Sequence, residues 1–466
     1  MKVAIVAPEV APFSKTGGLG DVAGALPGAL AALGAEVLTI SPLYRPVQKH
    51  APESTPHQLQ FSLGSLPSGV SVHRSGNHYF LEHRDYFDRD GLYGTSTGDF
   101  ADNGARFLCL CRGALELLRA LGAPDVIHAH DWQTGLIPMY VKTLYRDAFA
   151  RTRTVFTIHN LAYQGVFGRE MMPLTGLGWI HFNWKELEFH GNLNLMKAGL
   201  VYADALTTVS PGYAREIQTP EQGYGLEGVL RERSGALHGI LNGIDTAEWD
   251  PSNDPHLAAR YSAGAPAGKA ACKAALQRRC GLPERPEVPL VGFVGRLSVQ
   301  KGIDLLVGLL ESMGGEDVHW VILGAGDEIY QKALRAAAVR RPDRVSAHVA
   351  FDAALAHQIE AGSDLFVMPS LYEPCGLNQL YSLRYGAVPV VRATGGLADT
   401  VHDGENGFTF GPYTVEAFAG ALRRALEAFA DRAVWRKVMA AGMSRDSSWE
   451  ASARRYLWLY ESLVQG

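Results

Sequence analysis

Short runs of aliphatic and β-branched residues alternate with longer stretches of helical spacing from one end of the chain to the other. Runs that are apolar along their whole length form parallel strands buried on both faces. Five such runs lie in each half of the chain: residues 2–7, 36–42, 125–130, 154–159 and 205–210, then 290–295, 318–324, 345–351, 364–369 and 388–392. The pattern predicts an α/β protein with two doubly wound sheets, whose ligands bind at the carboxyl ends of the strands.

A turn-rich segment at residues 242–245 separates the two halves. Because domain boundaries fall in such linkers, we expect one domain over 1–243 and a second over 244–447. The last stretch, 448–466, carries apolar residues at helical spacing, which predicts a capping helix.

The overall charge disfavours some partners. The 466-residue chain has 43 basic and 48 acidic residues, a formal charge of −5, without a long run of either sign. This balance argues against nucleic acid or an anionic membrane held by bulk charge.

No apolar stretch approaches the ~18 residues of a membrane span. Pro8, Glu9 and Pro12 interrupt the first apolar run, which favours a strand over a signal peptide. Five cysteines without a Cys-x-x-Cys motif fit a reduced cytosol.

Two glycine-led motifs recur, one in each half. Residues 16–21 (Thr-Gly-Gly-Leu-Gly-Asp) reappear as residues 394–399 (Thr-Gly-Gly-Leu-Ala-Asp), each time where a helix is expected to begin. Glycine lets a ligand approach the backbone, and a helix amino end favours an anion or a polar oxygen. The repetition suggests a ligand held between two facing domains. Lys15 could neutralise a phosphate there; alternatively, it is a solvated loop lysine.

The first motif also fits the G-x-G-x-x-A pattern of nicotinamide cofactor sites, over residues 18–23. That fingerprint needs a tight turn directly after the strand, whereas about ten residues intervene here. The second strand ends in Ser41-Pro42, with no acidic residue to bind a ribose. A dehydrogenase is therefore disfavoured, and no cofactor is expected.

Three charged residues follow expected strands of the second half. Arg296 and Lys301 come after the strand at 290–295, where two cations can stabilise a diphosphate leaving group without a metal. Glu373 precedes a helix expected to begin near Gly376, and can accept hydrogen bonds from sugar hydroxyls or share charge with an oxocarbenium ion. The alternatives are a surface pair for the cations and helix-dipole complementarity for Glu373.

Several residues of the first half imitate metal sites. His128, His130 and Asp131 have metallohydrolase spacing, but no further His/Asp cluster completes the coordination. Residues 88–90 (Asp-Arg-Asp) imitate a manganese-binding Asp-x-Asp but lie in a turn-rich segment, so a loop is favoured. No metal is expected. The pair at 159–160 (His-Asn) closes a strand and is a better candidate for holding a polar ligand.

Five motifs, in order along nearly the whole chain, together resemble the bacterial glycogen synthases and plant starch synthases. They are Lys15-Thr16-Gly17-Gly18-Leu19, His128-Ala129-His130-Asp131-Trp132, Thr157 to Gly165, Gly295-Arg296 with Lys301, and Glu373-Pro374-Cys375-Gly376-Leu377. The resemblance implies the glycosyltransferase-B fold, in which two Rossmann-like domains face a deep cleft and the last helix crosses back to the first domain. It implies transfer of glucose from ADP-glucose to the non-reducing-end 4-hydroxyl of an α-1,4-glucan such as glycogen, in the cytoplasm, with retention of configuration. Protein partners stay open.

The resemblance also implies residue roles by motif position. Arg296 and Lys301 hold the ADP diphosphate, while Lys15, Gly17 and Gly18 close over the phosphate and sugar.

Two further residues act at the sugar in this reading. His159 bonds the 6-hydroxyl and helps to hold the transition state, and Glu373 holds sugar hydroxyls. The remaining expected substrate contacts are Asp131, Trp132, Asn160, Gln164, Asn242, Cys375, Gly376, Leu377 and Asn378.

The chain departs from related families at Tyr381, where many retaining transferases carry a second glutamate. This agrees with glycogen synthases. Because no carboxylate is placed as a nucleophile, same-face attack assisted by the leaving phosphate is the favoured hypothesis. The alternatives are another two-domain transferase using UDP-glucose, a phosphorylase-like enzyme with pyridoxal phosphate, and a catalytically silent glucan-binding protein.

Overall fold

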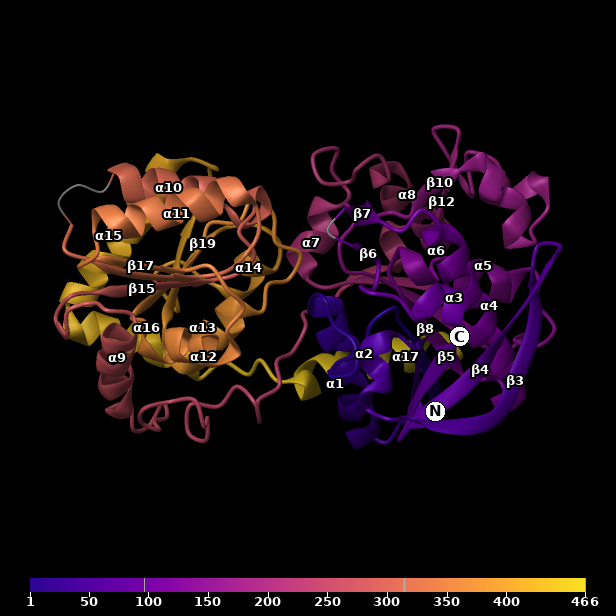
Figure 1. Cartoon of the computed structure of the whole chain (residues 1–466), viewed down its shortest axis with the longest axis horizontal. Helices are drawn as coiled ribbons and strands as arrows, with labels where there is room; N and C mark the ends of the chain where they lie inside the picture. The colour runs from indigo at the N-terminus through magenta and orange to yellow at the C-terminus, as the bar shows by residue number, and fades with distance from the viewer. Residues whose placement is uncertain (96, 313–315, 466) are drawn as a thin grey trace. The chain divides into compact units, whose positions relative to one another are not determined.

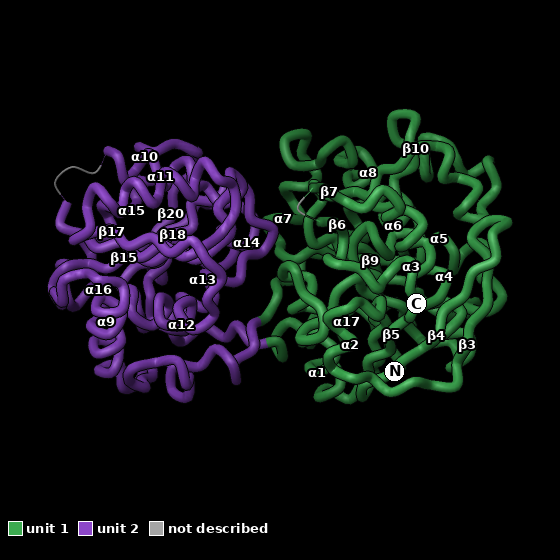
Figure 2. The backbone as a smooth tube through the Cα atoms, in the orientation of Figure 1, with its two compact units in different colours: residues 1–243, 449–466 green, residues 244–448 purple. Residues whose placement is uncertain are grey.

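The computed structural model describes residues 1–95, 97–312 and 316–465. The chain divides into two compact units (Figure 2). Unit 1 comprises Met1–Gly243 together with Trp449–Gly466, and unit 2 comprises Ile244–Ser448. The carboxyl-terminal segment therefore belongs to the same unit as the amino terminus. Among the described residues, no helix is both long and apolar enough to cross a membrane.

Unit 1 is built on a nine-stranded sheet in the order β14-β13-β9-β8-β1-β2-β5-β4-β3. The six strands from β14 to β2 in that order pair in parallel, and β5 joins β2 in parallel as well. Their bounds are β1 Lys2–Val6, β2 Glu36–Pro42, β5 His78–Glu82, β8 Val126–His130, β9 Arg153–Ile158, β13 Ala205–Thr208 and β14 Leu237–Gly239. All five strands expected in this half are present, most of them one or two residues shorter than expected.

An antiparallel hairpin extends the sheet beyond β5. Strands β3 (Glu53–Leu63) and β4 (Leu66–Ser75) pair with each other, and β4 pairs with β5. No strand was expected here, because β3 alternates exposed and half-buried residues instead of being apolar throughout. That alternation is typical of a sheet face that meets water. Smaller sheets join β6 Gly94–Thr95 to β7 Gly98–Asp99, and β10 Val166–Gly168 to β12 Asn192–Asn194 and β11 Glu188–Phe189.

The helices of unit 1 cover both faces of the parallel strands (Figure 1). They are α1 Gly18–Ala32, α2 Arg45–Gln48, α3 Arg84–Phe87, α4 Asn103–Leu121, α5 Leu136–Lys142, α6 Leu195–Tyr202, α7 Pro211–Glu216, α8 Glu227–Glu232 and α17 Trp449–Gln465. Helices α1 and α17 lie side by side. They bury Leu26, Leu30, Ala453 and Tyr456 in one cluster with Val3 of β1. This burial fixes the last helix to the amino-terminal unit.

Unit 2 contains a six-stranded, fully parallel sheet in the order β17-β16-β15-β18-β19-β20. The strands are β15 Leu290–Val294, β16 His319–Leu323, β17 Val345–His348, β18 Leu365–Met368, β19 Val388–Arg392 and β20 Phe408–Phe410. Alternate residues of one strand enter different cores: Val291 and Phe293 join one cluster, and Leu290 joins another. The predicted burial on both faces is confirmed.

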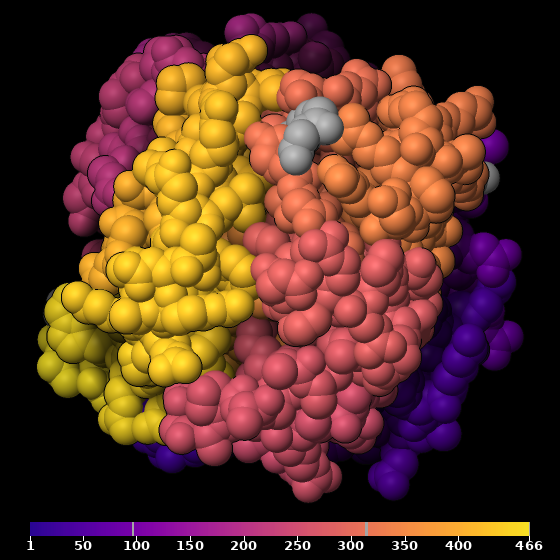
Figure 3. Space-filling view, turned by 90° about the vertical axis from the view of Figure 1, so that its left-hand side faces the viewer, coloured from indigo at the N-terminus to yellow at the C-terminus, as the bar shows by residue number. Residues whose placement is uncertain are grey.

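Helices lie on both sides of this sheet, with α10, α11 and α15 on one side and α9 and α12 on the other (Figure 1). Their bounds are α9 Gly268–Arg279, α10 Ile303–Ser312, α11 Glu328–Arg340, α12 Ala353–Gly362, α13 Asn378–Tyr385, α14 Gly395–Thr400, α15 Val415–Ala430 and α16 Arg432–Met443. Figure 3 shows one face of unit 2, where the rose segment before β15 meets the yellow segment near the end of the unit. A buried contact joins α9 to α15, because the Lys273 ammonium lies 5.3 Å from the centroid of the Phe429 ring.

Both sheets reverse their strand order beside a central strand. In unit 1 the reversal lies between β1 and β8, and in unit 2 between β15 and β18. Loops that leave adjacent strands in opposite directions open a crevice at the carboxyl ends of those strands, where ligands of such folds bind. The loops after β1, β8, β15 and β18 therefore border these crevices.

The attachment of α17 can be tested through a buried hydrogen bond. The Tyr460 hydroxyl lies 2.7 Å from His128 Nδ1, and both side chains are fully buried. Tyr460→Phe removes one partner and leaves a buried ring nitrogen unsatisfied, which costs about 1–3 kcal/mol. We expect faster amide hydrogen exchange in β8 and α17, while the exposed neighbour variant Glu461→Gln leaves exchange unchanged. Equal exchange in both variants would contradict this role.

Candidate active site

The loop between β1 and α1 is held by a buried carboxylate. Glu9 accepts hydrogen bonds from the Thr16 amide at 2.5 Å, the Thr16 hydroxyl at 2.6 Å and the Tyr93 hydroxyl at 2.5 Å. A buried carboxylate needs such donors, because an unpaired charge away from water is costly. Glu9 thus fixes the glycine-rich loop before any ligand binds.

The loop presents an open backbone next to a lysine. Gly17 caps α1 in an extended conformation, and a Cβ atom at this position would meet nothing within 4 Å. A Cβ at Gly24, by contrast, would lie 2.5 Å from the Ala11 carbonyl oxygen. The half-exposed Lys15 ammonium pairs with Asp21 at 2.6 Å. Lys15, Gly17 and Gly18 therefore lie together at an accessible helix amino end.

Two neighbouring strands of unit 1 end in side chains that hydrogen-bond to each other. His130 at the end of β8 and His159 just after β9 share a ring hydrogen bond of 2.9 Å between Nδ1 and Nε2. The Asp131 carboxylate accepts from the His159 amide at 2.7 Å, and the Asp131 amide donates to the Thr157 carbonyl. Asp131 holds a positive φ of 56°, a conformation uncommon for a residue with a side chain. The loop after β8 is thereby held against β9.

Burial keeps these imidazoles neutral. It lowers the pKa of His159 to about 3 and that of His128 to about 3, and it lowers the pKa of His130 well below its ordinary value. Burial also raises the pKa of Asp131 to about 7, although amide hydrogen bonds from residues 159 and 160 oppose the rise. At neutral pH, His159 is therefore a neutral hydrogen-bonding group, not a cation.

The residues that imitate metal sites have other partners. His128 Nε2 lies 2.5 Å from the Thr157 hydroxyl, and its Nδ1 contacts Tyr460. Asp88 and Asp90 both pair with Arg45. Within the described ranges, no group of three or more His, Cys, Asp or Glu side chains is arranged to hold a metal ion.

Aromatic packing surrounds the rest of the expected contacts in unit 1. The Trp132 ring lies edge-on to Phe107 at 5.1 Å and tilted to Phe167 at 5.7 Å. Gly165 has a positive φ of 61°, and a Cβ there would come within 2.3 Å of the indole, so only glycine fits. Asn160 is partly exposed and accepts a hydrogen bond from the Ala162 amide.

Gln164 and Asn242 are buried in the structure. The Gln164 side-chain amide donates to the Leu161 and Tyr224 carbonyls and accepts from Asn194 at 2.7 Å. These hydrogen bonds connect the loop after β9 to β12. Asn242 Oδ1, at the end of unit 1, has no hydrogen-bond partner among the described residues.

In unit 2 the central feature is an ion pair at the carboxyl ends of β15 and β18. The Lys301 ammonium lies 2.6 Å from Glu373 Oε2, to which the Ser370 hydroxyl also donates at 3.1 Å. Glu373 is 5% exposed. Arg296, at the start of the same loop as Lys301, is exposed and makes no ion pair with any described residue. The free guanidinium and the paired ammonium lie at the end of one strand.

Two glycine-led helix starts pack against each other beside this pair. The Gly396 amide donates to the Glu373 carbonyl at 3.1 Å, and a Cβ at Gly396 would lie 2.2 Å from the Cys375 carbonyl oxygen. Gly376 has a positive φ of 74°. Helix α13 begins at Asn378, two residues later than expected, with Leu377 at its cap. Asn378 donates to the Val294 carbonyl at 2.6 Å, which fastens α13 to β15.

The expected residues thus gather in two sets. Most of the unit 1 set lies after β1, β8 and β9, whereas Asn242 follows β14; the unit 2 set lies after β15 and β18. Glu9, Tyr93 and Ser370 support them and were missed by the sequence analysis. Only Glu9 gave a signal, as a lone acidic residue three positions after a buried strand.

Each unit has a parallel sheet, with neutral histidines at strand ends in unit 1 and cations with a buried carboxylate at strand ends in unit 2. These features suit a transferase that acts on an anionic sugar donor and indicate the class of two-domain glycosyltransferases. The comparisons agree. The family described as starch synthase catalytic domain matches residues 2–232, and glycosyl transferases group 1 matches residues 279–438. A glycogen synthase of Anaeromyxobacter sp. (strain Fw109-5) is 54% identical over the full length of both chains. A glycogen synthase of Koribacter versatilis is 48% identical, covering 100% of this chain and 99% of that one.

Solved structures point the same way. The catalytic domain of starch synthase IV from Arabidopsis thaliana, bound to ADP and acarbose, matches with a TM-score of 0.90 and 34% identity over 100% of this chain and 99% of that one. A sucrose-phosphate synthase from Thermosynechococcus elongatus shares the fold, with a TM-score of 0.64 and 19% identity. The chain belongs to the glycogen and starch synthase family, and its fold is the glycosyltransferase-B fold.

The raised pKa of Asp131 can be tested by pH dependence. A carboxyl group whose folded pKa lies above its unfolded value of 3.8 stabilises the fold fully below pH 3.8, and this stabilisation is lost as the pH rises to about 7. Asp131→Asn removes that loss. Relative to wild type, we expect the free energy of unfolding of the variant to rise by roughly 1.4 kcal/mol for each pH unit between pH 4 and 7.

The free energy of unfolding of unit 1 is read from hydrogen exchange of β8 and β9 at several pH values. Because the comparison is a difference between two proteins, the titration of other groups cancels. A stability difference that stays constant with pH would show that the Asp131 pKa is not raised.

Proposed function

We propose that this chain elongates an α-1,4-glucan such as glycogen, transferring glucose from ADP-glucose to the non-reducing-end 4-hydroxyl with retention of configuration. The observation that carries the proposal is the Lys301–Glu373 pair beside the unpaired Arg296, at the strand ends of unit 2. This arrangement offers positive charge to a diphosphate and a carboxylate to a sugar. The full-length relatedness to glycogen synthases supports the choice of reaction.

The donor diphosphate is bound by cations of unit 2. Among the described residues, no carboxylate pairs with Arg296, which presents a forked donor that suits phosphate oxygens. Lys301 adds a point charge while it orients Glu373. In a related chain, the starch synthase IV structure, ADP is bound. Charge on the leaving ADP is thus stabilised by fixed groups that need no rearrangement at the moment of reaction.

An aromatic side chain of unit 2 is available for the adenine ring. Phe351 follows the carboxyl end of β17, as Arg296 follows the carboxyl end of β15, and it is 96% exposed. Stacking a flat base on a solvent-exposed phenyl ring removes apolar surface from water and is therefore favourable. We assign the adenine to this ring.

Glu373 and the backbone from Cys375 to Asn378 hold the transferred glucose. The carboxylate accepts from sugar hydroxyls on the side that Lys301 and Ser370 leave open. The amino ends of α13, which begins at Asn378, and of α14, which begins at Gly395, provide amide donors next to it.

The unit 1 groups act on the sugar and the acceptor. His159 is neutral, so it donates or accepts a hydrogen bond at the 6-hydroxyl without adding positive charge near an oxocarbenium ion. Lys15 exchanges Asp21 for a phosphate oxygen, and the open backbone at Gly17 and Gly18 admits the ligand. Asp131, Trp132 and Asn160 meet the acceptor, with Gln164 and Asn242 supporting their loops.

Bond breaking proceeds from the same face as bond formation. The C1–O bond to the diphosphate breaks, its electron pair leaves with ADP, and the acceptor 4-hydroxyl attacks C1 from that side while its proton passes to a departing phosphate oxygen. No metal or cofactor takes part in this scheme. We also place the activity in the cytoplasm, because all five cysteines are thiols and not disulfides, as in a reducing compartment.

Incorporation of radiolabelled glucose into glycogen tests this function. We expect strong transfer from ADP-glucose, weaker transfer from UDP-glucose and no loss in EDTA, because cationic side chains supply the charge. A preference for UDP-glucose would overturn the assigned donor. Inhibition by EDTA would overturn the metal-free scheme, and no transfer from either donor would leave a glucan-binding protein.

Lys301 can be tested separately as a catalytic and as a structural residue. Lys301→Ala removes one fixed charge, and we expect turnover to fall about 10²–10³-fold. It also leaves the buried Glu373 without its cation, which lowers the free energy of unfolding of unit 2 by about 3–5 kcal/mol.

A double variant is the matched control. Lys301→Met with Glu373→Gln removes both charges, so stability recovers to near the wild-type value. Turnover stays low, because neither the cation nor the carboxylate is restored. Near-normal turnover in Lys301→Ala would remove Lys301 from the active site.

A further inference from the structure

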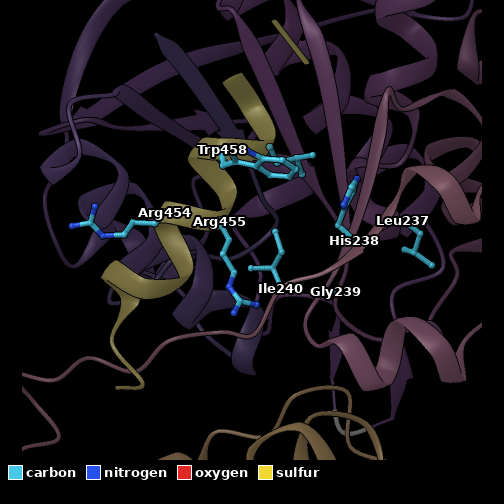
Figure 4. A pocket seen from close by; sticks show the side chains of 8 residues that line it. Leu237, His238, Gly239, Ile240, Arg454, Arg455 and Trp458 are labelled. Atoms are coloured by element: carbon cyan, nitrogen blue, oxygen red, sulfur yellow. The ribbon is translucent and has the colours of Figure 1, made fainter. Parts of the chain in front are cut away.

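A cavity of about 500 Å³ lies in unit 1 between the end of β14 and helix α17, and no residue assigned to the active site lines it. Figure 4 shows the side chains around it. The residues lining it are Leu237, His238, Gly239, Ile240, Arg454, Arg455, Trp458 and Leu459. They come from segments more than 200 residues apart in sequence, so the cavity exists only because α17 returns to this unit.

The floor of the cavity is apolar and firm. Ile240 and Leu459 are both buried, and Leu459 belongs to the core that fixes α17. At the next residue after Ile240, the Leu241 carbonyl accepts a hydrogen bond of 2.6 Å from the Ser452 hydroxyl of α17. The cavity is therefore preformed.

A flat aromatic ring forms one wall. Trp458 is 65% exposed although it belongs to a helix that buries its opposite face. In Figure 4 the indole extends over Ile240 towards His238. A single exposed tryptophan on a flat surface needs no ligand. Here the ring borders a concave apolar space with polar groups at its rim, which is the composition of a ligand site.

The rim carries little net charge. Arg454 points away from the cavity in Figure 4 and pairs with Glu450 at 2.5 Å. Arg455 makes no ion pair with a described residue, and burial lowers the pKa of His238, so that this ring is neutral at pH 7. One uncompensated cation does not suit a polyanion. It suits a neutral ligand with many hydroxyl groups, for which Arg455 and His238 supply hydrogen-bond donors.

We propose that this cavity is an accessory binding site for an α-1,4-glucan chain. A glucose ring has one face of C–H groups, which pack on the Trp458 indole and the aliphatic floor, while its hydroxyls bond to Arg455 and His238. The inference rests on the proposed function, which makes a branched glucan the acceptor. A second contact on the same polymer raises the local concentration of chain ends at the active site.

The site predicts a difference between long and short acceptors. Trp458→Ala should raise the KM for glycogen about 3–10-fold, the fold-change expected from losing one aromatic contact. The KM for ADP-glucose, and turnover with maltotriose, stay unchanged, because a trisaccharide occupies the active site alone. Trp458→Phe keeps an aromatic ring and restores most of the glycogen affinity.

Trp184→Ala is the matched control, since Trp184 is an even more exposed tryptophan of unit 1, at 71%, that lies outside the cavity. We expect it to leave the KM for glycogen unchanged. An equal rise of the KM for glycogen in both variants would assign the effect to nonspecific binding by exposed tryptophans and would overturn the proposed site. An unchanged KM in Trp458→Ala would also overturn it.

Affinity electrophoresis of the same variants in gels containing glycogen measures binding without turnover. Retardation of the wild-type protein should weaken in Trp458→Ala and remain in Trp184→Ala. Failure of the proposed function would appear differently, as absent glucose transfer by the wild-type enzyme. If the wild-type enzyme transfers glucose and Trp458→Ala is retarded equally, only the accessory site is lost.

Discussion

A parallel sheet must be covered on both faces, because its strands are joined by helices that cross it and its apolar side chains point both ways. In this chain that requirement covers the faces of the parallel strands and leaves the carboxyl ends of those strands open to a ligand. Val291 and Leu290 show the constraint at its simplest, since neighbouring residues of β15 enter different cores. The functional groups are consequently loop residues one to several positions past a buried strand, held by a framework that cannot easily move.

Electrostatics then divides these groups into two kinds. In unit 1 burial makes His130 and His159 neutral, so the histidines shape and orient without adding charge. In unit 2 the charges remain, but the buried Glu373 is balanced by Lys301, and Arg296 is left to attract an anion. A reaction that separates a positive sugar from a negative diphosphate needs this division: positive charge at the leaving group, and uncharged donors near the sugar.

Much of this could be predicted from the sequence, because strands buried on both faces are apolar throughout and because motif residues follow them directly. The hairpin β3–β4 was missed since half of its residues face water. Contacts between distant segments gave no local signal: Tyr93 reaches Glu9 across 84 residues, and Tyr460 reaches His128 across 332. Lys301 and Glu373 were both predicted as site residues, but their pairing was not. Gln164 was expected at the substrate, whereas its amide is occupied by Leu161, Tyr224 and Asn194.

The most direct test of this account is hydrogen exchange of the wild-type chain with and without ADP. A nucleotide held by Arg296, Lys301 and the helix starts after β18 should slow exchange at residues 295–302 and 373–379. Strands β16 and β20 should exchange as before. Protection confined to other segments, or no protection at saturating ADP, would contradict the assignment of the donor site to the strand ends of unit 2.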